Sequence, residues 1–185
     1  MEEENGIYYF SDYEPYSING ARNTRFNKVT GGYLLDLKDN KDIGVNYFTN
    51  LVINELREVE NLDEFDIITI IPSSEAHMFR IGMMRLAQSI DDEFENIEFV
   101  YCLERVETVE KKANGGIRSA ELEQRTIHAT EIEKFQDKKV LLFDDVTTTG
   151  TSLKSCEKIL IDNGAKEVVC LALAKTVNHH LISNI

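Results

Sequence analysis

One stretch, residues 140–153, constrains the fold of this chain more than any other. It begins with four apolar residues, continues with the adjacent acids Asp144 and Asp145, and then carries four threonines and a glycine before a helical pattern starts near Ser152. An apolar run that ends at acids is typical of a buried parallel strand, whose carboxyl end opens onto the ligand-binding edge of an α/β sheet. The stretch therefore predicts such a sheet, with a polar site at the end of this strand.

The loop after this strand has the composition of an anion site. Gly150 lets the backbone approach a ligand closely. Hydroxyl groups that could donate to an anion come from Thr147, Thr148, Thr149 and Thr151. The following helix would direct its unpaired amides and its positive dipole end at the loop, which suits a phosphate. A single acid or threonine at a strand end is usually a turn or a helix cap. A cap needs only one hydroxyl, however, so the whole combination favours a sugar-phosphate site.

Strand and helix patterns alternate along the chain. Apolar, β-branched runs predict further buried strands at 66–71, 97–103 and 168–174, and residues 33–38 read as a strand or a short helix. Apolar residues at helical spacing predict helices at 43–59, 79–90 and 153–162. Strands that alternate with helices through short loops form parallel sheets with right-handed crossovers. The expected fold class is therefore α/β, with a mostly parallel five-stranded sheet flanked by helices.

Two segments lack a clear core face. Residues 1–32 are rich in aromatic residues, and we interpret them as an N-terminal appendage that could serve as a hood beside an α/β domain of residues 33–185. Packing against the main sheet is the simpler role for these aromatic side chains. Residues 110–130 are polar and contain Gly115-Gly116, so a mobile flap and an exposed helix over 119–130 both fit.

Composition limits the classes of function. The chain has 185 residues and 33 acidic against 20 basic side chains, a net charge of -13, which argues against binding to nucleic acid or anionic membranes. No apolar run is long enough to cross a bilayer. The cysteines Cys102, Cys156 and Cys170 are scattered in apolar surroundings, as reduced core thiols are. We therefore expect a cytoplasmic protein that binds a small molecule.

The run 141–153 resembles the phosphoribosyl-pyrophosphate (PRPP) binding motif of type I phosphoribosyltransferases. Within that superfamily the chain is most similar to the ComF-like, competence-type proteins. Three further segments resemble the family's early leucine-and-lysine segment, its pyrophosphate loop and its variable loop: 35–38, 71–74 and 103–108. The usual Arg-Gly-Phe-Asn pattern reads Arg80-Ile81-Gly82-Met83 here. The resemblance spans residues 33–175 and implies a type I phosphoribosyltransferase fold.

The resemblance also implies a reaction and a donor site. A magnesium-dependent transferase would move the 5-phosphoribosyl group from PRPP to a nitrogenous base, or the reverse, with release of pyrophosphate. Asp144 and Asp145 would accept hydrogen bonds from the ribose 2′- and 3′-hydroxyls and meet Mg²⁺ through those hydroxyls or through water. The residues implied to hold the 5′-phosphate are Thr147, Thr148, Thr149, Gly150 and Thr151. Asp144, Asp145 and Arg105 are the implied catalytic residues.

The remaining site residues have alternatives. Ser73 and Ser74 would bind pyrophosphate, although a helix-capping loop fits them equally well. Arg105, Lys111 or Lys112 could close over the pyrophosphate, and Lys175 could contact the base or merely end the sheet. Four basic residues could either contact the ligand or form ordinary surface ion pairs: Lys38, Arg80, Arg85 and Arg105.

The expected partners are PRPP and a nucleobase or nucleotide. Type I enzymes are frequently homodimers, so a homodimer is expected from the resemblance. A non-catalytic PRPP or nucleotide sensor, which would keep the sugar-phosphate site and regulate a partner, is the alternative function. The sequence does not indicate which base is the acceptor.

Overall fold

A seven-stranded sheet runs through the computed structural model, which describes residues 1–18, 20–109 and 119–177. The strand order is β1-β2-β11-β10-β6-β7, and β3 pairs with the end of β11. All pairings are parallel except β1 with β2. The bounds are β1 Glu2–Glu4, β2 Ile7–Tyr9, β3 Asp12–Tyr13, β6 Ile67–Ile70, β7 Glu98–Phe99, β10 Lys139–Thr147 and β11 Glu167–Thr176. The predicted α/β fold with a mostly parallel sheet is confirmed, with seven strands where five were expected.

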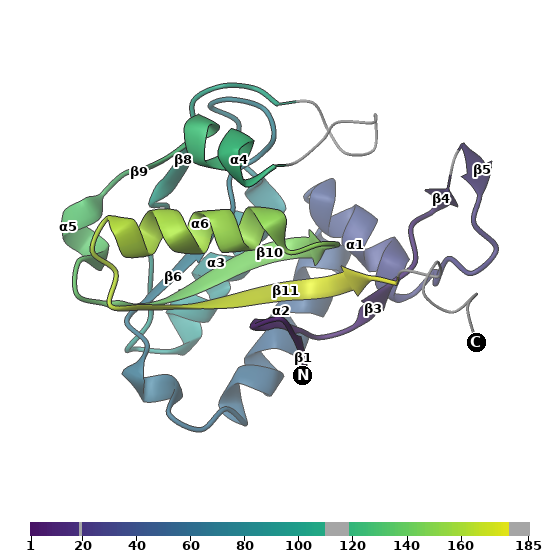
Figure 1. Ribbon diagram of the computed structural model, residues 1–185. Helices are drawn as coiled ribbons and strands as arrows, with labels where there is room; N and C mark the ends of the chain where they lie inside the picture. The colour runs from purple at the N-terminus through teal and green to yellow at the C-terminus, as the bar shows by residue number, and fades with distance from the viewer. Residues whose placement is uncertain (19, 110–118, 178–185) are drawn as a thin grey trace.

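Helices cover both faces of the sheet (Figure 1). On one face lies α6 (Thr151–Asp162), and on the other lie α1 (Thr30–Lys38), α2 (Asp42–Arg57) and α3 (Ile81–Glu93). Strand β10 serves both cores, because its side chains alternate: Val140 and Leu142 join the α6 core, whereas Leu141 and Phe143 join the core under α1 to α3. Burial of both faces explains why this strand is a continuous apolar run.

The predicted helices are confirmed as α2, α3 and α6, and residues 33–38 form the second half of helix α1 rather than a strand. Helix α1 packs very closely on its neighbours. A Cβ at Gly82 would lie 2.0 Å from the Leu37 carbonyl oxygen, and one at Gly44 would lie 2.3 Å from the Leu37 amide nitrogen. Two glycines on adjacent helices therefore make room for α1.

The predicted strand at 97–103 divides into two. Its first part is β7 at the sheet edge, and its last residue begins β8 (Leu103–Arg105), which pairs antiparallel with β9 (Ile127–Ala129) in a small separate sheet. Helix α4 (Ala120–Thr126) lies between β8 and β9, so a helix within 119–130 is confirmed. It is not wholly exposed, because Glu123 and Thr126 are buried. Gly115-Gly116 lies outside the described residues.

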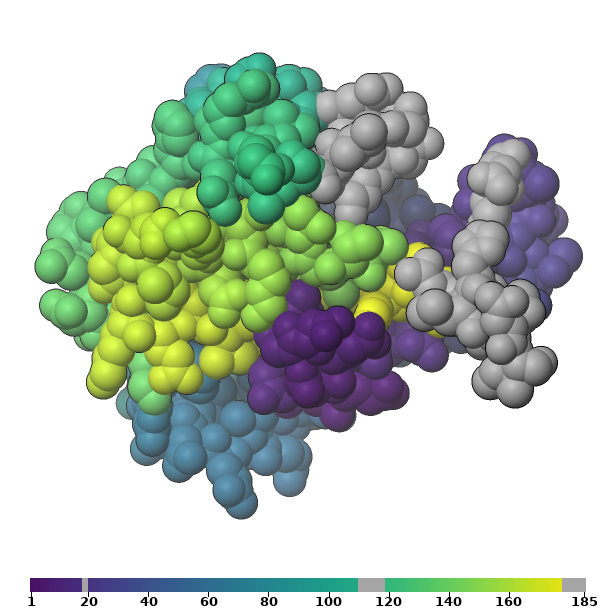
Figure 2. All heavy atoms as spheres, in the orientation of Figure 1, coloured from purple at the N-terminus to yellow at the C-terminus, as the bar shows by residue number. Residues whose placement is uncertain are grey.

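Short elements complete the chain, and the first residues belong to the main sheet. The 3-10 helix η1 (Leu62–Glu64) precedes β6, and α5 (Ile132–Phe135) precedes β10. Strands β1 to β3 occupy residues 2–13, whereas the hairpin of β4 (Ser17–Ile18) and β5 (Ala21–Arg22) stands away from the body (Figure 1). These strands lie within the predicted appendage of residues 1–32, and alternate residues of β2 face the core of the main sheet. Figure 2 shows these first residues, in dark purple, against the start of α6.

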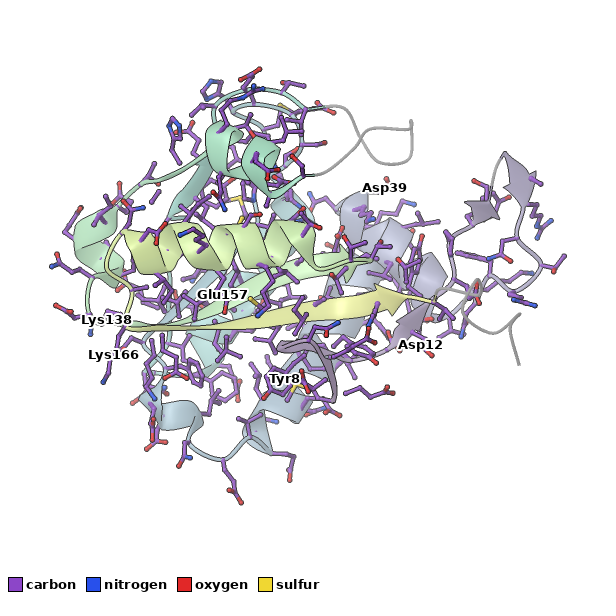
Figure 3. All side chains as sticks on the ribbon, in the orientation of Figure 1. Tyr8, Asp12, Asp39, Lys138, Glu157 and Lys166 are labelled. Atoms are coloured by element: carbon purple, nitrogen blue, oxygen red, sulfur yellow. The ribbon has the colours of Figure 1, made fainter. Side chains whose placement is uncertain are left out.

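The parallel strands give the sheet an amino end and a carboxyl end. Lys138 and Lys166, which precede β10 and β11, lie at one end, and Asp12 and Asp39 lie at the other (Figure 3). The second end is where the carboxyl ends of β6, β10 and β11 meet. Among the described residues, no helix is both long enough and apolar enough to cross a membrane.

Candidate functional site

The two acids of the opening stretch are held together by one arginine. Asp144 and Asp145 lie near the carboxyl end of β10. Arg80 Nη1 donates to Asp144 Oδ1 at 2.8 Å, and Arg80 Nη2 lies 2.7 Å from Asp145 Oδ2. Lys38 Nζ adds a longer contact of 3.4 Å to the same oxygen of Asp145. Only 18% of the Arg80 side chain and 13% and 12% of the two carboxylate side chains are exposed, so this is a shielded, formally neutral cluster.

Most of the acceptor oxygens in the cluster are engaged. Asp144 Oδ1 also accepts from the Asp145 amide at 2.8 Å, and Asp145 Oδ1 accepts from the Val146 amide at 2.6 Å. Of the four carboxylate oxygens, Asp144 Oδ2 alone has no recorded partner among the described residues. Asp145 Oδ1 accepts from one amide only, so a ribose diol, which needs two acceptors, can use Asp144 Oδ2 and the second lone pair of Asp145 Oδ1, the two oxygens that Arg80 does not contact.

The environment separates the pKa values of the two acids. Burial, together with the adjacent charge of Asp145, raises the pKa of Asp144 to about 6, although Arg80 opposes the shift. Burial acts on Asp145 as well, but Arg80 and Lys38 outweigh it and hold the pKa of Asp145 below its usual range. Asp144, whose Oδ2 has no partner among the described residues, is thus the acid with the pKa nearer to neutral pH.

Sequence reasoning left Arg80 open between surface pairing and ligand contact, and the structure places it inside the site. Arg80 immediately precedes α3, and its Nη1 also donates to the Ile71 carbonyl at 3.2 Å. Arg85, five residues on, forms a 2.7 Å pair with Asp42 in which both side chains are well exposed. Its position could have indicated this role, because Arg80 follows β6, the parallel neighbour of β10, and both strands end at the same edge of the sheet.

The threonine loop follows the acids directly. Gly150 has a φ of +76°, a left-handed conformation that suits glycine, and it is the N-cap of α6 without any side-chain cap. The N-cap residue therefore does not itself occupy the amides of the first turn of α6, which suits an anion site. Two hydroxyl pairs order the loop: Thr149 with Thr151 at 2.9 Å, and Thr148 with Thr176 at 3.1 Å.

A pocket of about 290 Å³ lies beside this loop. The loop contributes residues 147–150, and the other walls come from the first strands and from the end of β11: Glu4, Asn5, Ile7, Tyr9 and Lys175. Lys175 pairs with Glu4, and its Nζ lies 5.5 Å from the centre of the Tyr9 ring. Lys175 therefore lies in the wall of the pocket next to the threonine loop, already neutralised by an acid from β1.

The Ser73-Ser74 loop follows β6 and is anchored by its carbonyls. Ser73 O accepts from Arg105 Nε at 2.6 Å, and Ser74 O accepts from the Val109 amide at 2.9 Å. Ser73 Oγ accepts from the Glu75 amide at 3.1 Å, a local turn contact. Because β6 and β10 are parallel neighbours, this loop and the acid pair lie at the same edge of the sheet.

The Arg105 side chain is buried and does not lie at the surface of the site. Its side chain is 1% exposed, and it contacts the buried side chains Glu123 at 2.6 Å and Thr126 at 2.7 Å. The arginine contacts the Ser73-Ser74 loop from the protein interior, through the Ser73 carbonyl. Sequence reasoning did not single out Glu123, because a lone acid on a short polar helix carries no signal of burial. Lys111 and Lys112 lie outside the described residues.

The described residues contain no cluster of three or more acid, histidine or cysteine side chains that could hold a metal ion. Asp144 and Asp145 are two such groups, and both are already paired with cations. The donor set therefore does not form a protein-built cage for Mg²⁺. It does leave Asp144 Oδ2 able to accept from a hydroxyl or a water molecule.

No protein-family model matches the sequence, and no curated protein matches it. Solved structures that resemble it include a phosphoribosylpyrophosphate synthetase from Mycobacterium smegmatis, at 16% identity and a TM-score of 0.45 over 74% of this chain and 39% of that one. A purine phosphoribosyltransferase from Pyrococcus horikoshii gives 19% identity and a TM-score of 0.43 over 71% of this chain and 73% of that one.

A third similar structure is the allosteric regulatory enzyme of purine biosynthesis, at 18% identity and a TM-score of 0.45 over 71% of this chain and 26% of that one. The chain thus spans about a quarter of this enzyme and about two-fifths of the synthetase. All three TM-scores are below 0.5.

Proposed function

We propose that this chain is a PRPP-binding phosphoribosyltransferase of ComF-like type. The observation that carries the proposal is the order of features along the chain at the end of β10: an acid pair, a left-handed Gly150 and the N-terminus of α6, whose N-cap residue has no side chain. The acids suit a ribose diol, and the loop with the helix N-terminus suits its 5′-phosphate. The Ser73-Ser74 loop at the same edge offers a second anion site for pyrophosphate.

The proposed reaction breaks the bond between ribose C1 and a pyrophosphate oxygen, and the bonding electrons leave with pyrophosphate. A nitrogen of the acceptor forms the new bond to C1 and gives up its proton to solvent. Such chemistry depends on positioning and on electrostatic stabilisation of a cation-like sugar. Asp144 and Asp145 would orient the diol, and Arg105 would fix the pyrophosphate loop through the Ser73 carbonyl.

Arg80 sets a condition on this proposal. While it pairs with both acids, its charge offsets theirs and weakens their effect on a sugar cation. The diol would meet the acids at Asp144 Oδ2 and Asp145 Oδ1, which Arg80 does not contact, so it would bind beside the guanidinium charge. Mg²⁺ would supply a positive charge to offset the ligand phosphates. We propose that it is met through ribose hydroxyls or water, because Arg80 and Lys38 already engage the carboxylates.

The acceptor side of the site is proposed to include Lys175, which lies in the pocket wall beside the threonine loop. Glu4 neutralises this lysine, so a base that contacts it must compete with β1. We also propose a homodimer by family resemblance. Three buried free cysteines fit a reducing compartment, and we propose a cytoplasmic protein.

The alternative function, a non-catalytic PRPP or nucleotide sensor, is favoured by one observation. The Arg80 pairing leaves the acid cluster formally neutral with Lys38 included, which suits recognition of a polar sugar more than stabilisation of a cation. The sensor and the enzyme share the donor site. They differ in whether pyrophosphate is released.

Incubation with PRPP, Mg²⁺ and a panel of nucleobases, with pyrophosphate as the readout, tests the proposal. A transferase releases pyrophosphate faster with one base than without any base, and Asp144→Asn combined with Asp145→Asn abolishes that increase. Saturable PRPP binding without turnover on any base supports the sensor. The absence of PRPP binding overturns both.

A further inference from the structure

A buried chain of hydrogen bonds links the two candidate anion loops. Arg105 Nε donates to the Ser73 carbonyl at 2.6 Å, and Arg105 Nη2 donates to Glu123 Oε2 at 2.6 Å. The other oxygen of the same carboxylate, Glu123 Oε1, accepts from Ser152 Oγ at 2.8 Å. Ser152 is the second residue of α6, directly after the threonine loop. Three side chains from β8, α4 and α6 thus connect the Ser73-Ser74 loop to the phosphate loop.

The central ion pair of this chain is fully enclosed. The side chains of Arg105 and Glu123 are 1% and 0% exposed. A buried ion pair is a weak source of stability, because desolvation of the charges offsets most of their attraction and apolar pairs of similar volume often do as well. Both ends of this pair, moreover, reach groups that belong to candidate ligand loops. Positioning of those loops is therefore a better explanation for the pair than stability alone.

The geometry at Ser73 shows how positioning would work. Arg105 fixes the direction of the Ser73 carbonyl, and in a trans peptide the Ser74 N–H points the opposite way. The Ser74 amide donates to no recorded partner among the described residues, so it is available to a ligand. At the other end, the Glu123 carboxylate fixes the Ser152 side chain in the first turn of α6, where the amides face the threonine loop.

We propose that Arg105, Glu123 and Ser152 are positioning residues that couple the two loops, so that an anion bound at one loop raises the affinity of the other for its own anion. The inference rests on the proposed function, since it takes the two loops as sites for the 5′-phosphate and for pyrophosphate. The inference adds that buried side chains connect the two loops. A donor substrate that carries both anions would then be bound more tightly than a ligand with either one.

The coupling can be measured without turnover. The affinity for ribose 5-phosphate is determined by titration calorimetry with and without saturating pyrophosphate, in Mg²⁺ buffer. In the wild type we expect pyrophosphate to increase this affinity by about fivefold or more, the lower range of measured couplings between sites. In Ser152→Ala, which leaves the ion pair with Arg105 in place, we expect the ratio of the two affinities to fall to nearly one.

Helix α6 offers a matched control. Ser155 lies one turn after Ser152, is 2% exposed, and its hydroxyl has no hydrogen-bond partner among the described residues. Ser155→Ala removes the same atom from the same helix and should keep the wild-type ratio. Glu123→Gln, which retains the side-chain shape, should lower the ratio as Ser152→Ala does if it folds.

The outcomes separate two failures. A wild-type ratio of one with both ligands bound, or an equal ratio in Ser152→Ala and the wild type, overturns the coupling and leaves the proposed function standing. Failure of the folded wild type to bind either ligand overturns the proposed function, and the coupling with it.

Discussion

Replacement of Arg80 by methionine tests whether the acid cluster is a shielded ion-pair network. The substitution keeps an unbranched side chain of similar length and leaves two adjacent carboxylates with Lys38 as their remaining cation. Loss of one partner from a buried pair costs about 3–5 kcal/mol. Because 12–18% of these side chains is exposed and Lys38 remains, we expect the lower end, about 3 kcal/mol at pH 7.5. For a domain of this size that corresponds to a fall in Tm of about 6–12 °C.

The loss should depend on pH. Without Arg80, both carboxyl pKa values rise, and a protonated carboxyl costs less to bury, so the deficit of the variant should shrink at pH 5.5. In the wild type, the raised pKa of Asp144 means that its ionised form costs stability above about pH 6, and this stability is regained as the pH falls towards its ordinary pKa. Asp145 behaves oppositely: its contribution is present above its ordinary pKa and is lost as the pH falls through its lowered value.

Urea unfolding at pH 7.5 and 5.5 measures the free energy of unfolding of both proteins. Arg85→Met is the matched control, because Arg85 lies in α3, the helix that Arg80 immediately precedes, and its pair with Asp42 is exposed, which limits its loss to about 1 kcal/mol or less. Equal losses for the two variants, or a deficit of Arg80→Met that is the same at both pH values, would refute the account of the cluster.

Two further predictions concern ligand binding and the threonine loop. Affinity for ribose 5-phosphate should fall as the pH drops through about 6, because protonated Asp144 loses an acceptor; calorimetry of Asp144→Asn should show a flatter profile, and an identical profile would contradict this role. Gly150→Ala should destabilise the protein by about 1–2 kcal/mol, because the φ of +76° is unfavourable for alanine. Gly32→Ala, inside α1 with open space at its Cβ, should instead stabilise it by about 0.5–1 kcal/mol, and similar shifts in urea unfolding for both glycines would contradict the loop geometry.

The sequence predicted those elements whose pattern is set by burial. The apolar run of β10 and the helical spacing of α2, α3 and α6 follow from which faces are buried. Residues 33–38 were ambiguous because a short apolar run fits a strand or a helix equally well. In the structure α1 contacts Gly44 of α2 and Gly82 of α3, and these contacts lie outside the short run itself. The pairing of the first strands was left unassigned for a similar reason, since β2 is ordered by pairing with β11.

The candidate site shows the same limit. The acid pair and the threonine loop are contiguous, so their spacing alone indicated a sugar-phosphate site. Arg80, Arg105 and Glu123 act through contacts across the fold, and a charged residue has no local pattern that distinguishes a buried pair from an exposed one. Arg85 is also an arginine, five residues after Arg80, yet it forms an exposed pair, so the residue type alone does not indicate burial.

PRPP binding is the most direct test of the central claim, that the end of β10 is a donor-substrate site. Calorimetric titration of the wild type with PRPP and Mg²⁺ at pH 7.5 should give saturable binding. Asp144→Asn with Asp145→Asn should weaken it about 100-fold or more, because two charge-assisted hydrogen bonds are lost at about 1.5–3 kcal/mol each. Asp42→Asn, at an exposed pair, should bind as the wild type does. Unchanged PRPP affinity in the folded double variant would contradict the assignment of the acids.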